Sequence, residues 1–440
     1  MENMILFNIP EEVMYIINKF NNSGYEAYAV GGCIRDVFLG VLPNDWDITT
    51  NAKVEDIKHL FSTTIKTNTK HGTIIAVVNK NNYEISTYKS SPTNVSSITS
   101  DLGLRDFTMN AMAYHPQKGL LDPFLGLEDI KKSTIRTVGD PFHRLNEDPL
   151  RMLRAIRFSA ELGFEIDAFL LNSIKENCTL IKRISPERIE NEISKILISD
   201  RIERFIILRE TGLLAHIIPE FDLCFDVAQN HPYHIHNVAI HSLCAAANID
   251  KDRILRWAML LHDIGKSVTK TTDSKGIDHF YGHSFMSVGM AKNILERYHF
   301  SNAAKDRILR LIKYHDRPTN PNYKAVRKAV GITGIDLFLD LLKVQEADKR
   351  GQNPVYLEKG LNVLGEIKKI YYDIKNKKQC LTIKDLAING HDLLSMGMKQ
   401  GKEIGFILNK LLNYVLKNPD HNKKEILVGL VDDMKKSIGI

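Results

Sequence analysis

Apolar residues follow a helical repeat over most of the chain and a strand-like repeat in only a few short runs near its start. Residues 11–22 place their apolar side chains on one helical face, which predicts an amphipathic helix. The β-branched and aromatic runs 71–78 and 83–89 flank an NKNN turn and predict a hairpin. From residue 150 onward the pattern is almost entirely helical. We therefore expect an α+β fold, with a small mixed β-sheet at the head and helices after it.

The stretch from Tyr28 to Thr50, YAVGGCIRDVFLGVLPNDWDITT, predicts a strand, a glycine turn, a helix and a second strand. The glycine pair allows close approach of the main chain to a ligand. Asp45 and Asp47 are two residues apart, so on a strand both carboxylates point to one face while Trp46 points to the other. Two hard oxygen ligands beside such a turn suit Mg²⁺ together with a substrate phosphate. A solvated strand end is the plainer interpretation of the same pair.

Composition narrows the class of protein. The chain has 440 residues, of which 43% are hydrophobic and 25% charged, as in a soluble protein of two to four domains. No apolar run is long enough to cross a membrane and no secretory signal is recognisable, so we expect a cytoplasmic protein without a membrane segment. The five cysteines are scattered without CxxC spacing, which argues against a disulfide framework and a thiolate zinc site.

The net charge is +6, and between residues 351 and 440 lysines outnumber acidic residues by 15 to 10. A basic segment attracts a phosphate backbone, although solvated lysine-rich helices explain the same excess.

Four motifs in order, GGCIRD, PNDWDITT, RDFTMNAMA and EDPLR, resemble those of the class II nucleotidyltransferases, which comprise the tRNA CCA-adding enzymes and bacterial poly(A) polymerases. The resemblance implies that Asp45 and Asp47 are catalytic metal ligands and that Glu84 is a third carboxylate; alternation on a surface strand explains Glu84 almost as well. It also implies a set of nucleotide-binding residues: Gly31, Gly32, Arg35, Arg105, Asp106 and Asn110. Of these, Asp106 and Asn110 would contact the ribose. The same stretch also fits a helix capped by Asp106.

The EDPLR motif begins the strongest helix signal, with Asp148 at the cap, Pro149 at the first helical position and Arg151, Arg154 and Arg157 on the polar side. Asp148 and Arg151 are three residues apart, which also suits a simple local ion pair. The resemblance implies instead that they read the base, with Arg154 and Arg157 near the nucleotide. Cytosine and adenine each present an amine donor beside a ring-nitrogen acceptor, so a carboxylate beside a guanidinium matches both, whereas G and U present the opposite order.

A second group of motifs, HNVAIHSL, LLHDIGK, FYGHS, KYHD and QEADKR, resembles an HD phosphohydrolase domain. The resemblance implies one divalent ion held by His241, His262, Asp263 and Asp348, with His283 and His315 binding a second ion or a substrate phosphate. Imidazole with carboxylate suits a transition metal such as Mn²⁺ or Ni²⁺ better than Mg²⁺. Any single histidine of this group is also explained as a satisfied core or surface residue.

The resemblance spans the chain and predicts four parts: a nucleotidyltransferase head (1–140), a helical neck with the nucleotide-selecting motif (141–225), an HD domain (226–350) and a helical tail (351–440). It implies a CCA tRNA nucleotidyltransferase that uses CTP and ATP and binds tRNA through the tail lysines Lys399, Lys402 and Lys410. The short loop Ser90–Ser100 favours a CC-adding enzyme instead. The same motifs are also compatible with a poly(A) polymerase and with a protein that is mainly an HD hydrolase. The sequence leaves the oligomeric state open.

Overall fold

The computed structural model describes residues 9–66, 72–88 and 97–438. The chain divides into two units: residues 1–196 with 204–217, and residues 197–203 with 218–440. No helix within the described ranges is long and apolar enough to cross a membrane.

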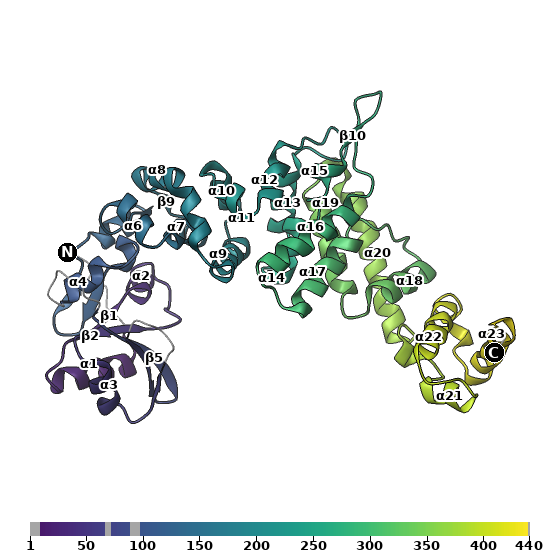
Figure 1. The fold of residues 1–440 in the computed structure, drawn as a ribbon, viewed down its shortest axis with the longest axis horizontal. Helices are drawn as coiled ribbons and strands as arrows, with labels where there is room; N and C mark the ends of the chain where they lie inside the picture. Colours follow the sequence, from purple (N-terminus) through teal and green to yellow (C-terminus); the bar gives the residue numbers. More distant parts are fainter. Residues whose placement is uncertain (1–8, 67–71, 89–96, 439–440) are drawn as a thin grey trace. The chain divides into compact units, whose positions relative to one another are not determined.

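The first unit is built on a mixed sheet of seven strands in the order β3-β4-β5-β2-β1-β6-β7. Figure 1 labels three of these strands, β1, β2 and β5. Strands β2 and β5 are parallel, and every other neighbouring pair is antiparallel. The strands are β1 Ala27–Val30, β2 Asp47–Thr50, β3 Thr64–Lys66, β4 Thr73–Val78, β5 Asn81–Thr87, β6 Ala113–His115 and β7 Gly119–Leu121. The expected α+β class with a small mixed sheet at the head is confirmed.

Short helices accompany the sheet: α1 Glu11–Asn22, α2 Gly32–Phe38, α3 Val54–Leu60, α4 Ile98–Gly103 and α5 Gly126–Lys131. Helix α1 has the predicted bounds, and its apolar face is completely buried. The predicted hairpin is also present, as β4 and β5. Strand β2 begins at Asp47, so Asp45 lies in the preceding loop rather than on the strand. Of the segment Ser90–Ser100, positions 90–96 lie outside the described residues, and Ile98 begins α4.

The RDFTMNAMA segment does not form the capped helix that its residues also fit. Thr108–Asn110 make one 3₁₀ turn, and the chain then enters β6. Val30 of β1 pairs with Ala113 of β6, and the main-chain N–H of Gly31 donates to the carbonyl oxygen of Met112 at 3.2 Å. This long-range pairing with the central strand outweighs the local helical preference of the segment.

The rest of the first unit is helical: α6 Pro141–Glu147, α7 Leu150–Leu162, α8 Ala168–Asn177, α9 Pro186–Ile198, α10 Ile206–Glu210 and α11 Leu214–Ile217. A two-residue parallel bridge joins β8 Thr134–Ile135 to β9 Glu165–Ile166. Helix α7 begins at Leu150, one residue after the predicted first helical position, and the Asp148 carboxylate accepts the main-chain N–H of Leu150 at 3.2 Å. It ends at Gly163, whose φ of 77° is the left-handed cap conformation.

The second unit is almost entirely helical: α12 Pro219–Asp222, α13 Val238–Ala247, α14 Arg253–Leu261, α15 Lys266–Thr269, α16 His283–Arg297, α17 Asn302–Tyr314, α18 Tyr323–Thr333, α19 Phe338–Arg350, α20 Leu357–Asn376, α21 Gly390–Ser395, α22 Lys402–Val415 and α23 Lys424–Ile438. A hairpin of β10 Thr271–Thr272 and β11 Asp278–His279 projects from these helices (Figure 1). One hydrophobic core joins residues of α18 and α19 to residues of α20, α22 and α23, so packing continues across position 350. Leu393 is buried in this core, whereas the neighbouring Leu394 is 37% exposed.

Candidate functional site

A cleft of about 340 Å³ in the first unit gathers half of the ten predicted nucleotide-binding residues together with two of the three predicted catalytic carboxylates. It is lined by residues that include Asp47, Glu84, Arg105, Asp106, Asp148, Arg151 and Arg154. They come from the sheet, from the segment before β6 and from the start of α7. The cleft therefore places carboxylates from two strands and the EDPLR side chains around one space.

Two carboxylates of this cleft, Asp47 and Glu84, come from adjacent parallel strands. Asp47 of β2 lies opposite Glu84 of β5 in the register. Burial raises the pKa of Asp47 to about 6; Arg105 opposes this shift, while Glu84 and Asp45 add to it. A carboxylate that is costly to ionise among other carboxylates fits a site that holds a divalent cation. Asp45 itself is exposed in the loop before β2 and does not line the cleft.

The glycine turn positions Arg105. Gly31 has a φ of 83°, and a Cβ atom at this position would lie 2.6 Å from Nη1 of Arg105. A side chain at residue 31 would therefore be strained and would displace the guanidinium. The turn thus lets the Arg105 guanidinium lie against the main chain at Gly31, and Gly32 begins helix α2.

A hydrogen-bonded chain links four of the predicted residues. Arg35 Nη1 donates to Asn110 Oδ1 at 2.8 Å, and Asn110 Nδ2 donates to Asp106 Oδ1 at 3.2 Å. Arg154 Nε donates to Asp106 Oδ2 at 2.8 Å. Burial raises the pKa of Asp106, but Arg154 and these hydrogen bonds outweigh it and hold that pKa below its usual value. Arg35 and Asn110 thus act on the cleft by holding Asp106 rather than by lining it.

Asp148 and Arg151 line the same cleft without a direct ion pair between them in the described structure. Arg151 donates from Nη1 to the carbonyl of Arg144 and to Glu147, and from Nη2 to the carbonyl of Leu104. These three bonds leave two of its five N–H donors. Asp148 is held by Arg188 at 3.2 Å. Both side chains are fixed, and each retains hydrogen-bonding capacity.

Arg157 is placed differently from the other arginines of α7. Its guanidinium is buried and pairs with Glu192 at 2.7 Å and with Glu161 at 2.9 Å. It does not line the cleft and links α7 to α9.

Sequence reasoning missed Glu147 and Arg188, which hold Arg151 and Asp148. Glu147 is part of the EDPLR motif and lies four residues before Arg151, so this spacing could have indicated the contact. For Arg188, 40 residues away from Asp148 in the sequence, local patterns offered none.

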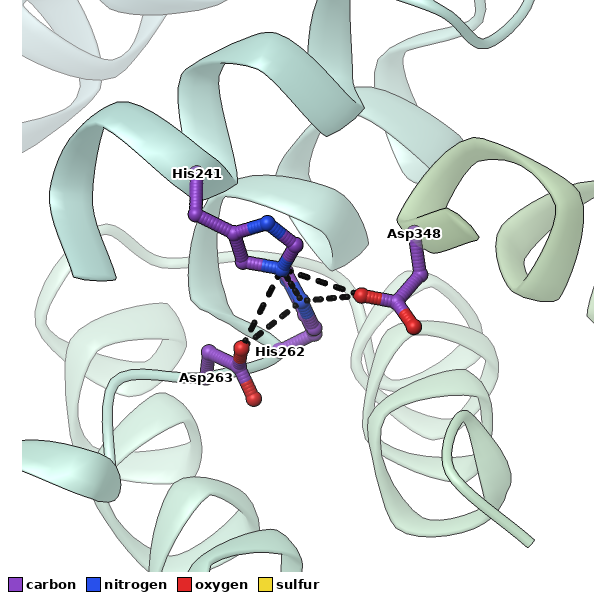
Figure 2. A group of neighbouring side chains, drawn as sticks. All are labelled: His241, His262, Asp263 and Asp348. Atoms are coloured by element: carbon purple, nitrogen blue, oxygen red, sulfur yellow. Dashed lines mark hydrogen bonds and ion pairs between the residues drawn. The ribbon is translucent and has the colours of Figure 1, made fainter. Parts of the chain in front are cut away.

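The second unit brings the six predicted ligands of the HD motifs together. His241 of α13, His262 and Asp263 after α14, and Asp348 of α19 point toward one another (Figure 2). His283 at the start of α16 and His315 at the end of α17 form a second group with Asp263.

All four histidines present the same ring nitrogen to this cluster. Each Nδ1 lies 2.7–3.0 Å from a main-chain carbonyl oxygen, which is within hydrogen-bonding distance. The pairs are His241 with Gly351, His262 with Met259, His283 with Phe280, and His315 with Ile312. A carbonyl only accepts, so each Nδ1 carries a proton, and when a ring is neutral the lone pair of its Nε2 faces inward. This is the arrangement that metal-bound histidines adopt.

The distances in the first group fit ligation of one ion. The Nε2 atoms of His241 and His262 are 3.3 Å apart, and Asp348 Oδ1 is 3.0 Å from the first and 3.4 Å from the second. Ligand atoms bound at about 2.1 Å to one ion lie about 3.0–3.4 Å from each other. Two facing lone pairs at this distance repel unless a cation or a proton lies between them. Burial lowers the pKa of His262, but the neighbouring Asp263 and Asp348 outweigh it and raise that pKa to about 10, so the metal-free cluster retains a proton.

Asp263 connects the two groups. Its Oδ2 is 3.2 Å from His262 Nε2, whereas its Oδ1 is 3.3 Å from His283 Nε2 and 3.5 Å from His315 Nε2. Oδ1 is buried without a hydrogen bond to any described residue. One carboxylate thus faces both sets of imidazoles, an arrangement suited to bridging two ions.

Gly265 and Lys266 complete the surroundings. A Cβ atom at Gly265 would lie 2.4 Å from the main-chain oxygen of His283, so glycine lets the turn after α14 pack against α16. Lys266 Nζ pairs with Asp263 Oδ2 at 2.7 Å.

The three predicted RNA-binding lysines, Lys399, Lys402 and Lys410, are exposed near α22. Lys410 lies 4.6 Å from the ring centroid of Phe406, which is itself 55% exposed. All three lysines are thus accessible to a partner.

Three families match successive parts of the chain: "Poly A polymerase head domain" over residues 27–136, "Probable RNA and SrmB-binding site of polymerase A" over 163–224, and "tRNA nucleotidyltransferase domain 2 putative" over 283–431. A CCA-adding enzyme of Ligilactobacillus salivarius is 30% identical over 97% of each chain. One from Geobacillus stearothermophilus is 41% identical over 47% of this chain and 54% of its own. The crystal structure of the Bacillus stearothermophilus CCA-adding enzyme in complex with CTP superposes with a TM-score of 0.75 at 28% identity, covering 98% of each chain.

Proposed function

The chain belongs to the family of CCA-adding enzymes and is a metal-dependent nucleotidyltransferase, and we propose that it adds C, C and A in turn to the 3′ end of tRNA. It uses CTP and ATP for this reaction and releases pyrophosphate. The observation that carries the proposal is that one cleft holds both the Asp47–Glu84 carboxylates and the Asp148–Arg151 pair. A nucleotide bound there would have its phosphates at one group and its base at the other. A tRNA substrate favours action in the cytoplasm.

Different residues of the cleft bind the triphosphate, the ribose and the metal ion. Arg105 binds the triphosphate, and Asp106, held by Asn110 and Arg154, receives the ribose hydroxyl. Asp47 and Glu84, with Asp45 from the adjoining loop, would hold Mg²⁺, which stabilises charge on the reacting phosphate when bound.

Base selection falls to Asp148 and Arg151. Asp148 accepts the exocyclic amine of C or A, and the two remaining N–H donors of Arg151 face the ring nitrogen.

Nucleotide incorporation separates CCA addition from CC addition and from poly(A) synthesis. Purified protein is incubated with tRNA that lacks its 3′ end and with CTP alone, ATP alone or both. We expect two C residues with CTP alone and a completed CCA with both. Arrest after CC in the presence of ATP would identify a CC-adding enzyme, and long A tails would identify a poly(A) polymerase.

A second function is favoured by the histidine–aspartate cluster, defined as His241, His262, Asp263, His283, His315 and Asp348. We propose that it is a phosphohydrolase site loaded with a transition metal such as Mn²⁺ or Ni²⁺. Support comes from the four Nδ1 contacts to carbonyls, which turn every Nε2 toward the two carboxylates. When bound, such ions activate water for attack on phosphorus. The chain itself holds the ligands in the required tautomer and keeps Lys266 beside Asp263.

Metal analysis and hydrolysis assays test this second function. Protein reconstituted with Mn²⁺ or Ni²⁺ should retain metal after gel filtration and hydrolyse phosphoesters. His262→Ala should lose both properties. Wild-type protein that retains no metal and hydrolyses no phosphoester would show that the cluster is structural.

Exposed Lys399, Lys402 and Lys410 support contact between the tail and tRNA phosphates. Replacing all three with alanine should weaken tRNA binding and reduce its salt dependence. Unchanged affinity would place the contact elsewhere.

A further inference from the structure

Two clefts meet beside the histidine–aspartate cluster, and His231 and His234 line both of them. The first, of about 500 Å³, is also lined by Tyr233, Tyr356, Lys349 and Lys359. The second, of about 330 Å³, is also lined by Phe280, Tyr281 and the cluster residue His283. We name them the lysine cleft and the hairpin cleft. Each has the volume of a small-ligand pocket.

Both clefts reach the cluster. In the lysine cleft, Gln352 Nε2 donates to Asp348 Oδ2 at 2.9 Å. The hairpin cleft contains His283 and Lys266, and Lys266 pairs with Asp263. A phosphate at the cluster would therefore have open space on two sides.

Aromatic rings line each cleft in positions suited to nucleobases. In the lysine cleft, the rings of Tyr233 and Tyr356 are 4.5 Å apart, and His231 stacks on Tyr233 at 5.2 Å. In the hairpin cleft, His279 and Tyr281 stack at 5.4 Å with an interplanar angle of 8°, and Tyr281 is 79% exposed. Exposed rings beside a phosphate site are the usual platforms for bases of single-stranded nucleic acid.

The lysine cleft also carries uncompensated positive charge. No described carboxylate forms an ion pair with the ammonium group of Lys349 or Lys359, whereas the next cation of α19, Arg350, pairs with Glu346 at 2.8 Å. Two ammonium groups of this kind beside aromatic rings fit a strand that continues with a further phosphate.

His234 lines both the lysine cleft and the hairpin cleft. Its Nδ1 atom is buried and has no hydrogen-bond partner among the described residues.

We propose that the histidine–aspartate cluster acts on a linear phosphodiester of a nucleic-acid strand, with one nucleoside in the lysine cleft, the other in the hairpin cleft and the phosphate between them at the cluster. This inference rests on the proposed hydrolytic function of the cluster. In the reaction, the oxygen of water bonds to phosphorus, the bond from phosphorus to the leaving nucleoside oxygen breaks, and that oxygen takes up a proton from the water. The products are a phosphomonoester and a free hydroxyl group. A mononucleotide would fill only one cleft.

Binding is tested first, without metal. Full-length protein in EDTA, with excess CTP to occupy the head, is titrated calorimetrically with adenylyl-(3′,5′)-adenosine and with adenosine 3′-monophosphate. The dinucleotide should bind about tenfold more tightly, because its second base stacks in the other cleft. Tyr356→Ala and Lys359→Ala should remove this advantage, whereas Tyr356→Phe should keep it. Lys368→Ala is the matched control, since residue 368 is an exposed lysine on the opposite face of α20.

Cleavage is tested next with Mn²⁺-loaded protein and the same two compounds. The dinucleotide should be cleaved, with a KM that rises about tenfold in Lys359→Ala and stays unchanged in Lys368→Ala. Hydrolysis of the monophosphate alone would overturn the two-cleft inference and leave the phosphohydrolase intact. Hydrolysis of neither compound, together with absence of bound metal, would overturn the phosphohydrolase itself. Equal affinity for both compounds in the calorimeter would overturn the assignment of the clefts in either case.

Discussion

Replacing Asp47 with asparagine is expected to make the metal-free protein more stable while it abolishes nucleotide addition. Burial, with the nearby Glu84 and Asp45, raises the pKa of Asp47 from 3.8 to about 6 despite Arg105. The folded state thus binds a proton at Asp47 more tightly than the unfolded state does, so Asp47 destabilises the fold increasingly as the pH rises above 3.8, and the full cost is reached above about pH 6. Asparagine cannot ionise, and the variant is relieved of this cost.

The size of the effect follows from the shift. A difference of roughly two pKa units corresponds to about 3 kcal/mol. Because the carboxylate is only partly shielded from water, we expect about 1–2 kcal/mol at pH 8. The gain should shrink to about half at pH 5, where much of the folded wild type is protonated, and vanish near the unfolded pKa of 3.8.

Urea unfolding in EDTA at pH 8 and pH 5 measures this difference. The chain has two tryptophans, Trp46 in the head and Trp257 in the second unit, so a Trp257→Phe background makes the fluorescence report on the head alone. Glu55→Gln, at an exposed carboxylate of α3, is the matched control and should change stability little at either pH. Mg²⁺ should stabilise the wild type and not Asp47→Asn. A variant no more stable than the wild type at pH 8 would refute the reasoning, since Arg105 would then fully compensate the buried charge.

Three further predictions concern the other residues. Swapping the base-reading pair, as Asp148→Arg with Arg151→Asp, reverses donor and acceptor, so the preference for CTP and ATP over UTP and GTP should fall at least about tenfold in incorporation assays; a swap variant that folds by circular dichroism and keeps the preference would place base selection elsewhere. His262→Ala should remove metal binding by the cluster and leave CCA addition at the wild-type rate, and a parallel loss of addition in a folded variant would contradict independent sites. Gly265→Ala should force the turn after α14 away from His283 and reduce the retained metal, measured by atomic absorption, because the new Cβ atom would lie 2.4 Å from a main-chain oxygen; unchanged metal content would show that the turn can move without disturbing the ligands.

Local patterns predicted the parts of the molecule that depend on nearby residues. The strand, glycine turn and helix around Gly31 follow from the positions of glycine and of apolar residues, and the start of α7 follows from Asp148 and Pro149. Placing Glu84 beside the aspartates depended on the resemblance, since only the parallel pairing of β2 with β5 brings it there.

The remaining differences have long-range causes. Ala113 joins a strand because β1 offers it a partner, and Arg157 turns inward because Glu192 of α9 neutralises it in the core. Lys359 belongs to no motif, and only the packing of α20 against α19 brings it to the same cleft as Lys349. Periodicity identifies which face of an element is apolar, but it does not identify the partner that a polar side chain meets.

In each candidate metal site the ligand atoms repel one another before an ion binds, but the repelling atoms differ between the two sites. In the head, the repulsion is between carboxylate oxygens, and the raised pKa of Asp47 means that a proton or a hard cation relieves it. In the histidine–aspartate cluster, imidazole lone pairs face one another at 3.3 Å with their tautomers fixed by carbonyls, so a borderline metal relieves the repulsion best. Each site lies within its own unit, and neither shares a ligand with the other. The two proposals therefore predict Mg²⁺ in the head and a transition metal in the histidine–aspartate cluster, because carboxylate oxygens favour the first ion and imidazole nitrogens favour the second.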